Sequence, residues 1–345
     1  MEEIRLNCAL LRKRVPNLTT AAKEAGIRPA TVSNLCTGKI DLGKAEVKTL
    51  IGLAKLANCT VDELIIRGEK LKMIETQIKA FDFFAPLVKG GTTGIVARPG
   101  MGQLVIVAEL LHRFKGSELK TVYLKPESFH PELEGIVELA EHSSSTVTET
   151  LELLKQYGDN AVLVTDKGRI DSGQLFELQN GLQGQAVTTL LVDLSGEVVD
   201  DDFPFGPLET LWQLDADLAA RHQYPALSPL QSASSILEEA EVSDRHLQLR
   251  QRVQKTLRRY RELRSITTAH GIERIPQSER EIYHRGERLE AYFTQPLFVA
   301  EEFSGKKAES VSLQETLAGA EAILAGAADG RDLSELQYTG ALKGA

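Results

Sequence analysis

The chain has 345 residues, of which 42% are hydrophobic and 26% are charged, so it is long enough for two or three packed domains. No apolar run is long enough to span a bilayer, and the N-terminus begins with acidic residues instead of a signal peptide's basic region, which predicts a cytoplasmic protein with no membrane partner. Residues 1–70 carry 12 Lys or Arg and 8 Asp or Glu, a net charge of +4, which leaves 28 and 41 and a net of −13 for the remainder; a basic head on an acidic body can orient a protein on DNA.

Three cysteines, Cys8, Cys36 and Cys59, lie near the N-terminus. Their spacing fits no metal site, and their odd number argues against a disulfide framework. The pattern predicts small buried thiols and no bound metal.

Residues 4–14 predict a first amphipathic helix, with three leucines on one face. A second, alanine-rich helix follows, and Asn17 or Thr19 can cap its start. Gly26 then supplies a sharp turn that a β-carbon would obstruct. Residues 28–35 predict a third helix, whose Pro29 lies in the first turn, where its missing N–H costs nothing. Gly38 is expected to end this helix, and two further helices are predicted around residues 44–57 and 60–66.

This five-helix pattern resembles the Cro-like (XRE) helix-turn-helix family of phage repressors between Ala21 and Leu64. The small residues of the second helix, Gly26, the stretch ATVSNL and the closing LAKLANCTVDEL carry the resemblance. It implies that the third helix enters the major groove of double-stranded DNA. Residues expected at base edges are Ala30, Thr31, Ser33 and Asn34, and residues expected near phosphates are Arg28, Lys39 and Lys44. The alternative is a helical domain used only for protein contacts.

From Met73 the pattern changes to alternating strands and helices. Strands are predicted near residues 93–97, 120–124, 161–165 and 188–193, and helices from about residue 230 to the end. The expected fold is therefore α/β with all-α parts, a parallel sheet between two helical regions. Domain boundaries are expected at 1–70 for the helix-turn-helix domain, 71–229 for a sheet-containing nucleotide domain and 230–345 for a helical domain.

Four stretches of this body resemble the β subunit of F-type ATP synthase, whose nucleotide domain is RecA-like. They are residues 74–111, 213–237, 259–266 and 293–305, and the last, FTQPLFVAEEFSG, is long and specific. The β subunit's N-terminal barrel is absent, and the middle of the nucleotide domain, about residues 170–200, is shortened. The rotor-contacting loop of that family reads IERIPQSE here, with its acidic character diluted, so coupling to a rotary shaft is not expected.

A working phosphate loop reads GxxxxGK[ST], because its Lys meets phosphate oxygens and its hydroxyl holds Mg²⁺. Here Gln103 stands in place of the Lys and Leu104 in place of the hydroxyl. Arg98 is either a substitute cation or a solvated side chain. The residues expected around a nucleotide phosphate are Arg98, Gly100, Met101, Gly102, Gln103 and Leu104. An anion could still meet the helix N-terminus there, so the expected cofactor is none, or ATP or ADP bound weakly without Mg²⁺.

Other positions of the family give a mixed pattern. Asp166 aligns with a Walker B acid, and Glu127 aligns with the general base only across a gap, the alternative being a surface carboxylate. No catalytic residue is therefore expected, and Glu127 and Asp166 are the only candidates. Ser235 stands in place of an arginine, so a neighbouring copy would receive no arginine finger. The adenine pocket would comprise Tyr224, Leu297, Ala300 and Phe303, whose alternative role is core packing.

Together these patterns predict a DNA-binding regulatory protein whose catalytically degenerate body mediates homo-oligomerisation or weak nucleotide sensing. Side-by-side packing of ring-type subunits would array several DNA-binding heads. Two alternatives stay open: an ATPase related to the β subunit that tolerates the altered loop, and a structural or assembly protein. The altered loop favours a protein without ATPase activity.

Overall fold

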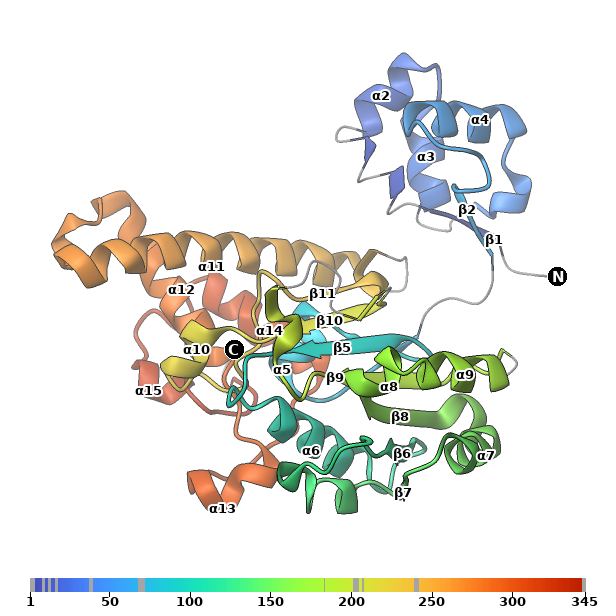
Figure 1. Cartoon of the computed structure of the whole chain (residues 1–345). Coiled ribbons are helices and arrows are strands. Elements are labelled where there is room, and N and C mark those ends of the chain that lie inside the picture. The colour runs from blue at the N-terminus through green and yellow to red at the C-terminus, as the bar shows by residue number, and fades with distance from the viewer. Residues whose placement is uncertain are drawn as a thin grey trace. The chain divides into compact units, whose positions relative to one another are not determined.

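The computed structural model describes residues 4–7, 10–11, 14–15, 18–36, 40–67, 72–182, 184–200, 205–206, 208–238 and 242–342. The chain forms two compact units (Figure 1). The first unit comprises Met1–Lys72 and Ser235–Ser243, and the second comprises Met73–Ser234 and Asp244–Ala345. The sheet and the C-terminal helices, expected as separate domains at 71–229 and 230–345, therefore belong to one unit.

The first unit is mainly helical and contains a short two-stranded sheet. Its elements are β1 (Ile4–Leu6), α2 (Leu18–Glu24), α3 (Pro29–Cys36), η1 (Leu42–Lys44), α4 (Val47–Leu56) and β2 (Ile65–Arg67). The second, third and fourth helices thus lie close to where the sequence predicts them. Gly26, with φ of 73°, occupies the turn between α2 and α3, as expected of a residue without a β-carbon. Asn17 and Gly38 lie outside the described residues.

Two predicted helices of this unit are wrong in part. Residues 4–6 form β1 instead of the start of a helix over 4–14, although Leu10, Leu11 and Arg14 are helical. Residues 61–64 form a turn and residues 65–67 form β2, where a helix over 60–66 was expected. The two strands pair antiparallel, Ile4 opposite Arg67 and Leu6 opposite Ile65. This long-range pairing outweighs local helical periodicity, and the β-branched pair Ile65 and Ile66 favours it.

The second unit is built on a seven-stranded sheet. Its strand order is β11-β10-β5-β9-β8-β6-β7, parallel throughout except for the antiparallel pair β10 and β11. The strands are β5 (Thr92–Val96), β6 (Lys120–Leu124), β7 (His142–Ser144), β8 (Ala161–Asp166), β9 (Thr188–Val192), β10 (Thr210–Gln213) and β11 (Ala233–Ser234). The four strands predicted from the sequence, β5, β6, β8 and β9, are confirmed. They form the centre of the sheet.

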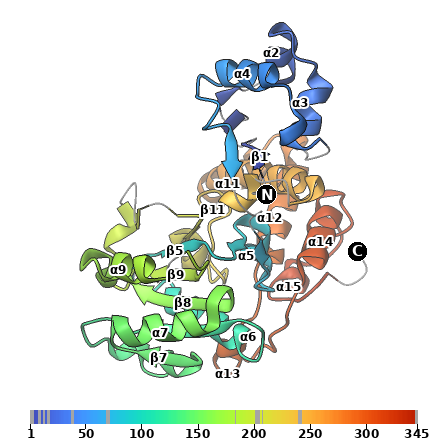
Figure 2. The ribbon, with the colours of Figure 1, turned by 90° about the vertical axis from the view of Figure 1, so that its right-hand side faces the viewer.

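Helices cover both faces of this sheet (Figures 1 and 2). The described α-helices of the second unit are α5 (Lys79–Phe84), α6 (Gln103–Phe114), α7 (Val147–Tyr157), α8 (Lys167–Asp171), α9 (Gln174–Gly181), α10 (Ala216–Ala220), α11 (Asp244–His270), α12 (Arg280–Tyr292), α13 (Glu301–Ser304), α14 (Leu313–Leu324) and α15 (Leu333–Leu336). Alternate residues of β8 enter two cores: Val162 and Val164 pack with α5, α6, α11, α12 and α14, and Leu163 packs with α7 and α9. This period of two is that of a strand buried on both faces.

The C-terminal helices share a core with the sheet because α5 connects them. Trp212 of β10 is fully buried, its indole N–H donates to the Ala85 carbonyl at 2.7 Å, and its ring meets Phe81 edge to face. Lys79 of α5 is also buried, and its Nζ donates to the carbonyls of Tyr292 at 2.5 Å and Thr339 at 2.7 Å. The C-terminal segment around Thr339 thus packs against α5. Within the described part of the chain, no helix has the length and apolarity needed to cross a membrane.

Candidate nucleotide site

Four parallel strands bring their carboxyl ends to one edge of the sheet. β5, β9, β8 and β6 lie side by side in that order. The loop 97–102 follows β5, Asp193 follows β9, Asp166 is the last residue of β8, and Glu127 follows β6. Ligands of parallel sheets bind at this edge. The altered loop, Asp166 and Glu127 therefore all lie at the carboxyl-terminal edge of the sheet.

The loop before α6 contains two glycines in the left-handed backbone conformation. Gly100 and Gly102 have φ of 80° and 94°, values that only glycine adopts without strain. A β-carbon on either would meet no atom within 4 Å, so the space beside the loop is open. Gly102 caps α6 without a side-chain hydrogen bond. The amides of the first turn can therefore still meet an anion.

The side chains of the loop do not supply a phosphate clamp. Gln103 is buried, Met101 lies in the core, and Leu104 packs against that core. Arg98 is exposed and leaves the loop before its turn. The first turn of α6 thus offers neither an ammonium group nor a hydroxyl, the groups that meet the phosphates and Mg²⁺ in a working loop.

Asp166 ends β8 and is buried, with 8% of its surface exposed. Its Oδ2 accepts a hydrogen bond from the Gly168 amide at 2.8 Å, which caps α8, while its Oδ1 is buried without a partner among the described residues. Burial raises the pKa of Asp166, and hydrogen bonds from backbone amides oppose this only in part. A buried polar atom of this kind usually has a partner, so this oxygen is free to accept a hydrogen bond from a water molecule or a ligand.

Glu127 is exposed and is held by two neighbours. Its Oε1 accepts from Gln174 at 2.6 Å and lies 3.4 Å from a guanidinium nitrogen of Arg169. The Arg169 side chain is buried and also donates to the carbonyls of Lys125, at 2.6 and 3.0 Å, and Ser145, at 3.1 Å. Arg169 therefore ties the ends of β6 and β7 to α8. Arg169 cannot be recognised as a site residue from the sequence, because its acceptors come from separate segments and no local spacing marks them.

The four expected adenine-pocket residues occupy different environments. Phe303 on α13 is 97% exposed, so it packs in no core of this chain. Leu297 is buried, Ala300 is half-buried, and Tyr224 is half-buried with its hydroxyl donating to the Ala219 carbonyl at 3.3 Å. The segment that contains Tyr224 meets the segment that leads to Leu297, because the backbone N–H of Gln295 donates to the Tyr224 carbonyl at 3.0 Å.

The segment that carries Phe303 is anchored to α6. The Val299 amide donates to Glu109 at 3.1 Å, and Glu109 forms a buried ion pair with Arg113 at 2.6 Å. The Arg113 guanidinium also lies 4.9 Å from the centre of the Phe298 ring. These contacts hold the segment that carries the exposed Phe303 against α6, the helix that follows the glycine loop. Ser235, where the family resemblance implies an arginine, begins η6 (Ser235–Glu238) in the segment that groups with the first unit.

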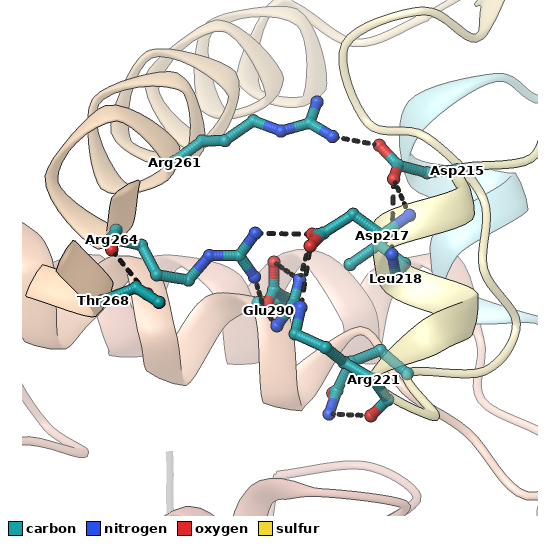
Figure 3. Close-up of polar contacts among 9 residues, drawn as sticks. Asp215, Asp217, Leu218, Arg221, Arg261, Arg264, Thr268 and Glu290 are labelled. Atoms are coloured by element: carbon teal, nitrogen blue, oxygen red, sulfur yellow. Dashed lines mark hydrogen bonds and ion pairs between the residues drawn. The ribbon is translucent and has the colours of Figure 1, made fainter. Parts of the chain in front are cut away.

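A network of charged residues joins the end of β10 and α10 to α11 and α12 (Figure 3). Arg261 lies 2.7 Å from Asp215, and Arg264 lies 2.5 Å from Asp217. Arg221 pairs with Asp217 at 2.8 Å and also contacts Glu290. Burial alone would raise the pKa of Asp217, but hydrogen bonds from Arg221 and Arg264 outweigh it and hold that pKa below its usual value. Because every charge here is paired, the network acts as a structural clamp between sheet and helices.

In the first unit, the residues expected to contact DNA lie on or near α3. Arg28 and Ala30 are exposed, Thr31 and Asn34 are half-buried, and Lys44 is exposed at the end of η1. Lys39 and Cys8 lie outside the described residues, and the side chain of Ser33 is not described. Cys36 and Cys59 are half-buried, where buried thiols were expected, and burial raises the pKa of the Cys59 thiol. The described residues contain no cluster of three or more metal-binding side chains.

No protein-family model matches the chain. The ATP synthase β subunit of Coprothermobacter proteolyticus is 29% identical over 317 residues, which cover 74% of this chain and 69% of the relative. ATP synthase subunit beta 2 of Nitrosomonas eutropha is 30% identical over 312 residues, covering 73% of this chain and 64% of the relative. About three quarters of this chain is thus similar in sequence to ATP synthase β subunits. The expected resemblance of the body is therefore confirmed.

A solved structure supports the same fold. The ATP synthase subunit NeqB from Nanoarcheaum equitans superposes with a TM-score of 0.58 at 15% identity, covering 75% of this chain and 77% of that one. The β-like body is thus a mixed α/β structure with a parallel-sheet core and a helical C-terminal region. These similarities give no support to a DNA-binding role for the first unit, which stays a prediction.

Proposed function

We propose that this chain is an ATP synthase β-like assembly protein whose body self-associates and does not hydrolyse ATP. The observation that carries the proposal is the first turn of α6, where buried Gln103 and core-packed Leu104 replace the Lys and hydroxyl of a working loop. Removing the groups that stabilise charge on a transferring phosphoryl group lowers the rate by orders of magnitude. The amides after Gly102 retain a weak, Mg²⁺-independent affinity for ATP or ADP.

The test restores the missing groups. We expect ATP hydrolysis by the natural chain at background, and weak nucleotide binding that Mg²⁺ does not change. The double variant Gln103→Lys with Leu104→Thr should bind ATP more tightly and in a Mg²⁺-dependent way. The matched control Val105→Thr places a hydroxyl on the exposed side of the same turn and should bind ATP as the natural chain does.

Two results would contradict the proposal. Steady, Mg²⁺-dependent hydrolysis by the natural chain would favour the ATPase alternative. Light scattering that finds only monomers at all concentrations, with or without ATP, would remove the assembly role.

A second function, sequence-specific DNA binding by the first unit, is favoured by one observation. α3 follows α2 through the turn at Gly26, and it buries Val32 and Leu35 while leaving Arg28 and Ala30 exposed. An exposed face of small and polar residues suits the major groove better than an apolar protein interface. In the full chain, Thr31→Ala with Asn34→Ala should lower sequence preference more than non-specific affinity, whereas Lys55→Ala on α4 should change neither. Failure of the chain to shift any duplex from a genomic pool at low salt would exclude this function.

A further inference from the structure

We propose that copies of this chain associate head to tail, with a basic face on α11 of one copy against an acidic edge of the next. The basic face comprises Arg252, Lys255 and Arg258. The acidic edge comprises Glu132, Glu134 and Glu138. The inference rests on the self-association proposed above and names the two surfaces that carry it.

The basic face lies on the outer side of a long helix. Its three cations recur every third residue and are exposed, while the inner side of α11 is buried through Leu249, Val253 and Leu257. None of the three forms an ion pair with a described residue. Basic neighbours on the same helix do, Arg259 with Glu279 and Arg261 with Asp215. The second unit therefore neutralises part of α11 internally and leaves this face uncompensated.

The acidic edge lies beside β7, the strand at one edge of the sheet. Glu132 belongs to η2 (Pro131–Leu133), Glu138 belongs to η3 (Val137–Leu139), and Glu134 lies between them. All three are exposed, and no described cation pairs with them. Nearby, α7 carries the exposed Glu149 and Glu152 against one exposed cation, Lys155, and so adds to the negative charge, and η3 contacts β7. This edge thus carries unbalanced negative charge next to the end of the sheet.

The two charged surfaces lie on opposite sides of the second unit. β7 ends one edge of the sheet, whereas α11 packs against α5, α12 and α14. In both Figure 1 and Figure 2, α11 and β7 lie at opposite ends of this unit. The surfaces therefore cannot neutralise each other within one copy. Two copies can bring them together, and because the surfaces differ, the contact is heterologous and repeats into a ring or a filament.

Charge complementarity identifies a second copy as the occupant. The three exposed cations of the basic face match three exposed carboxylates that the same chain presents, so neither surface needs a different partner. Each of these exposed pairs is individually weak and is screened by salt. The association should therefore weaken steeply as ionic strength rises.

The test reverses the charges of each surface and then of both. One variant carries Arg252→Glu, Lys255→Glu and Arg258→Glu, and a second carries Glu132→Lys, Glu134→Lys and Glu138→Lys. Glu and Lys are both good helix formers, so α11 should persist. In sedimentation at low salt, each variant alone should raise the self-dissociation constant by about 10- to 100-fold. A chain with both sets of changes should regain affinity, because the charges are exchanged and not lost.

A control variant separates local pairing from total charge. Lys72→Glu, Arg274→Glu and Lys307→Glu change the net charge as much as the α11 variant, at exposed positions without ion pairs among the described residues. This control should associate as the natural chain does.

Three results would overturn the inference. Self-association that neither variant weakens, or that the combined variant fails to restore, overturns this inference and leaves the proposed assembly role standing. A natural chain that is monomeric at every concentration removes the assembly role itself, and this inference with it. An α11 variant that associates normally but loses salt-sensitive DNA binding would assign the basic face to nucleic acid and also overturn the inference.

Discussion

Replacing Lys79 by methionine should change how the stability of the second unit depends on pH. Burial lowers the pKa of Lys79 to about 7, against the weaker opposing effect of the Glu309 carboxylate. In the unfolded chain this amine has an ordinary pKa near 10.4. Between pH 7 and pH 9 the unfolded state therefore holds more protons at this site than the folded state. The sign follows from linkage: stability rises with pH in this window.

The magnitude follows from the same difference. The two states differ by about half a proton at pH 7 and by nearly one above pH 8, and each full proton is worth about 1.4 kcal/mol per pH unit. The free energy of unfolding of the natural chain should thus gain about 2 kcal/mol between pH 7 and pH 9 from this site. Lys79→Met has no amine to titrate and should lack that gain.

The assay is urea unfolding at pH 7, 8 and 9, followed by tryptophan fluorescence. The chain contains one tryptophan, Trp212, and it is fully buried in the second unit. Lys89→Met is the matched control, because the Lys89 amine is half-buried and, within the described part of the chain, donates a hydrogen bond to Asn160 alone, at 2.9 Å. If the natural chain and Lys79→Met differ by the same free energy at pH 7 and pH 9, the pKa of Lys79 is not depressed.

Two further changes test the packing of the second unit. Gly94→Ala in β5 would place a β-carbon 2.4 Å from the Phe205 ring, so we expect the free energy of unfolding in urea to fall by about 1–3 kcal/mol. In the control Gly330→Ala the new β-carbon meets no atom within 4 Å, so the free energy of unfolding should change little. Equal losses in the two variants would contradict this packing. Ser312→Ala removes the capping box that Ser312 forms with Glu315 at the start of α14 and should cost about 1 kcal/mol, and an unchanged melting temperature would show that the cap contributes nothing.

The central strands could be predicted because they are continuous apolar runs. Residues 161–165 read AVLVT and become β8, buried on both faces. β7 could not be predicted, because its three residues, HSS, have no apolar pattern and form a strand only beside β6. β1 was predicted as a helix for a related reason. Its pairing partner lies about sixty residues away in the chain, and local periodicity does not contain that contact.

The site was predictable to the extent that its chemistry lies in consecutive residues. The sequence shows that Gln103 replaces the lysine of a working phosphate loop and that Leu104 replaces its hydroxyl residue. It also shows Asp166 at the end of an apolar strand. The buried Arg169 and the clamp around Asp217 were not visible, because their partners come together only when α8, α10, α11 and α12 are placed. Spacing along the chain predicts local motifs and cannot predict such long-range pairs.

The position of β5 in the sheet has a consequence during synthesis. Both of its neighbours, β9 and β10, are made later, and the Thr92 amide reaches its Glu209 partner across 117 residues. At about 5–20 residues per second, a ribosome needs roughly 6–23 s to make that stretch. During this time the edge of β5 that pairs with β10 stays unpaired, and the other edge is also unpaired until β9 has been made. An unpaired edge of this kind can pair with another chain, so the incomplete protein is more prone to aggregate than the finished one.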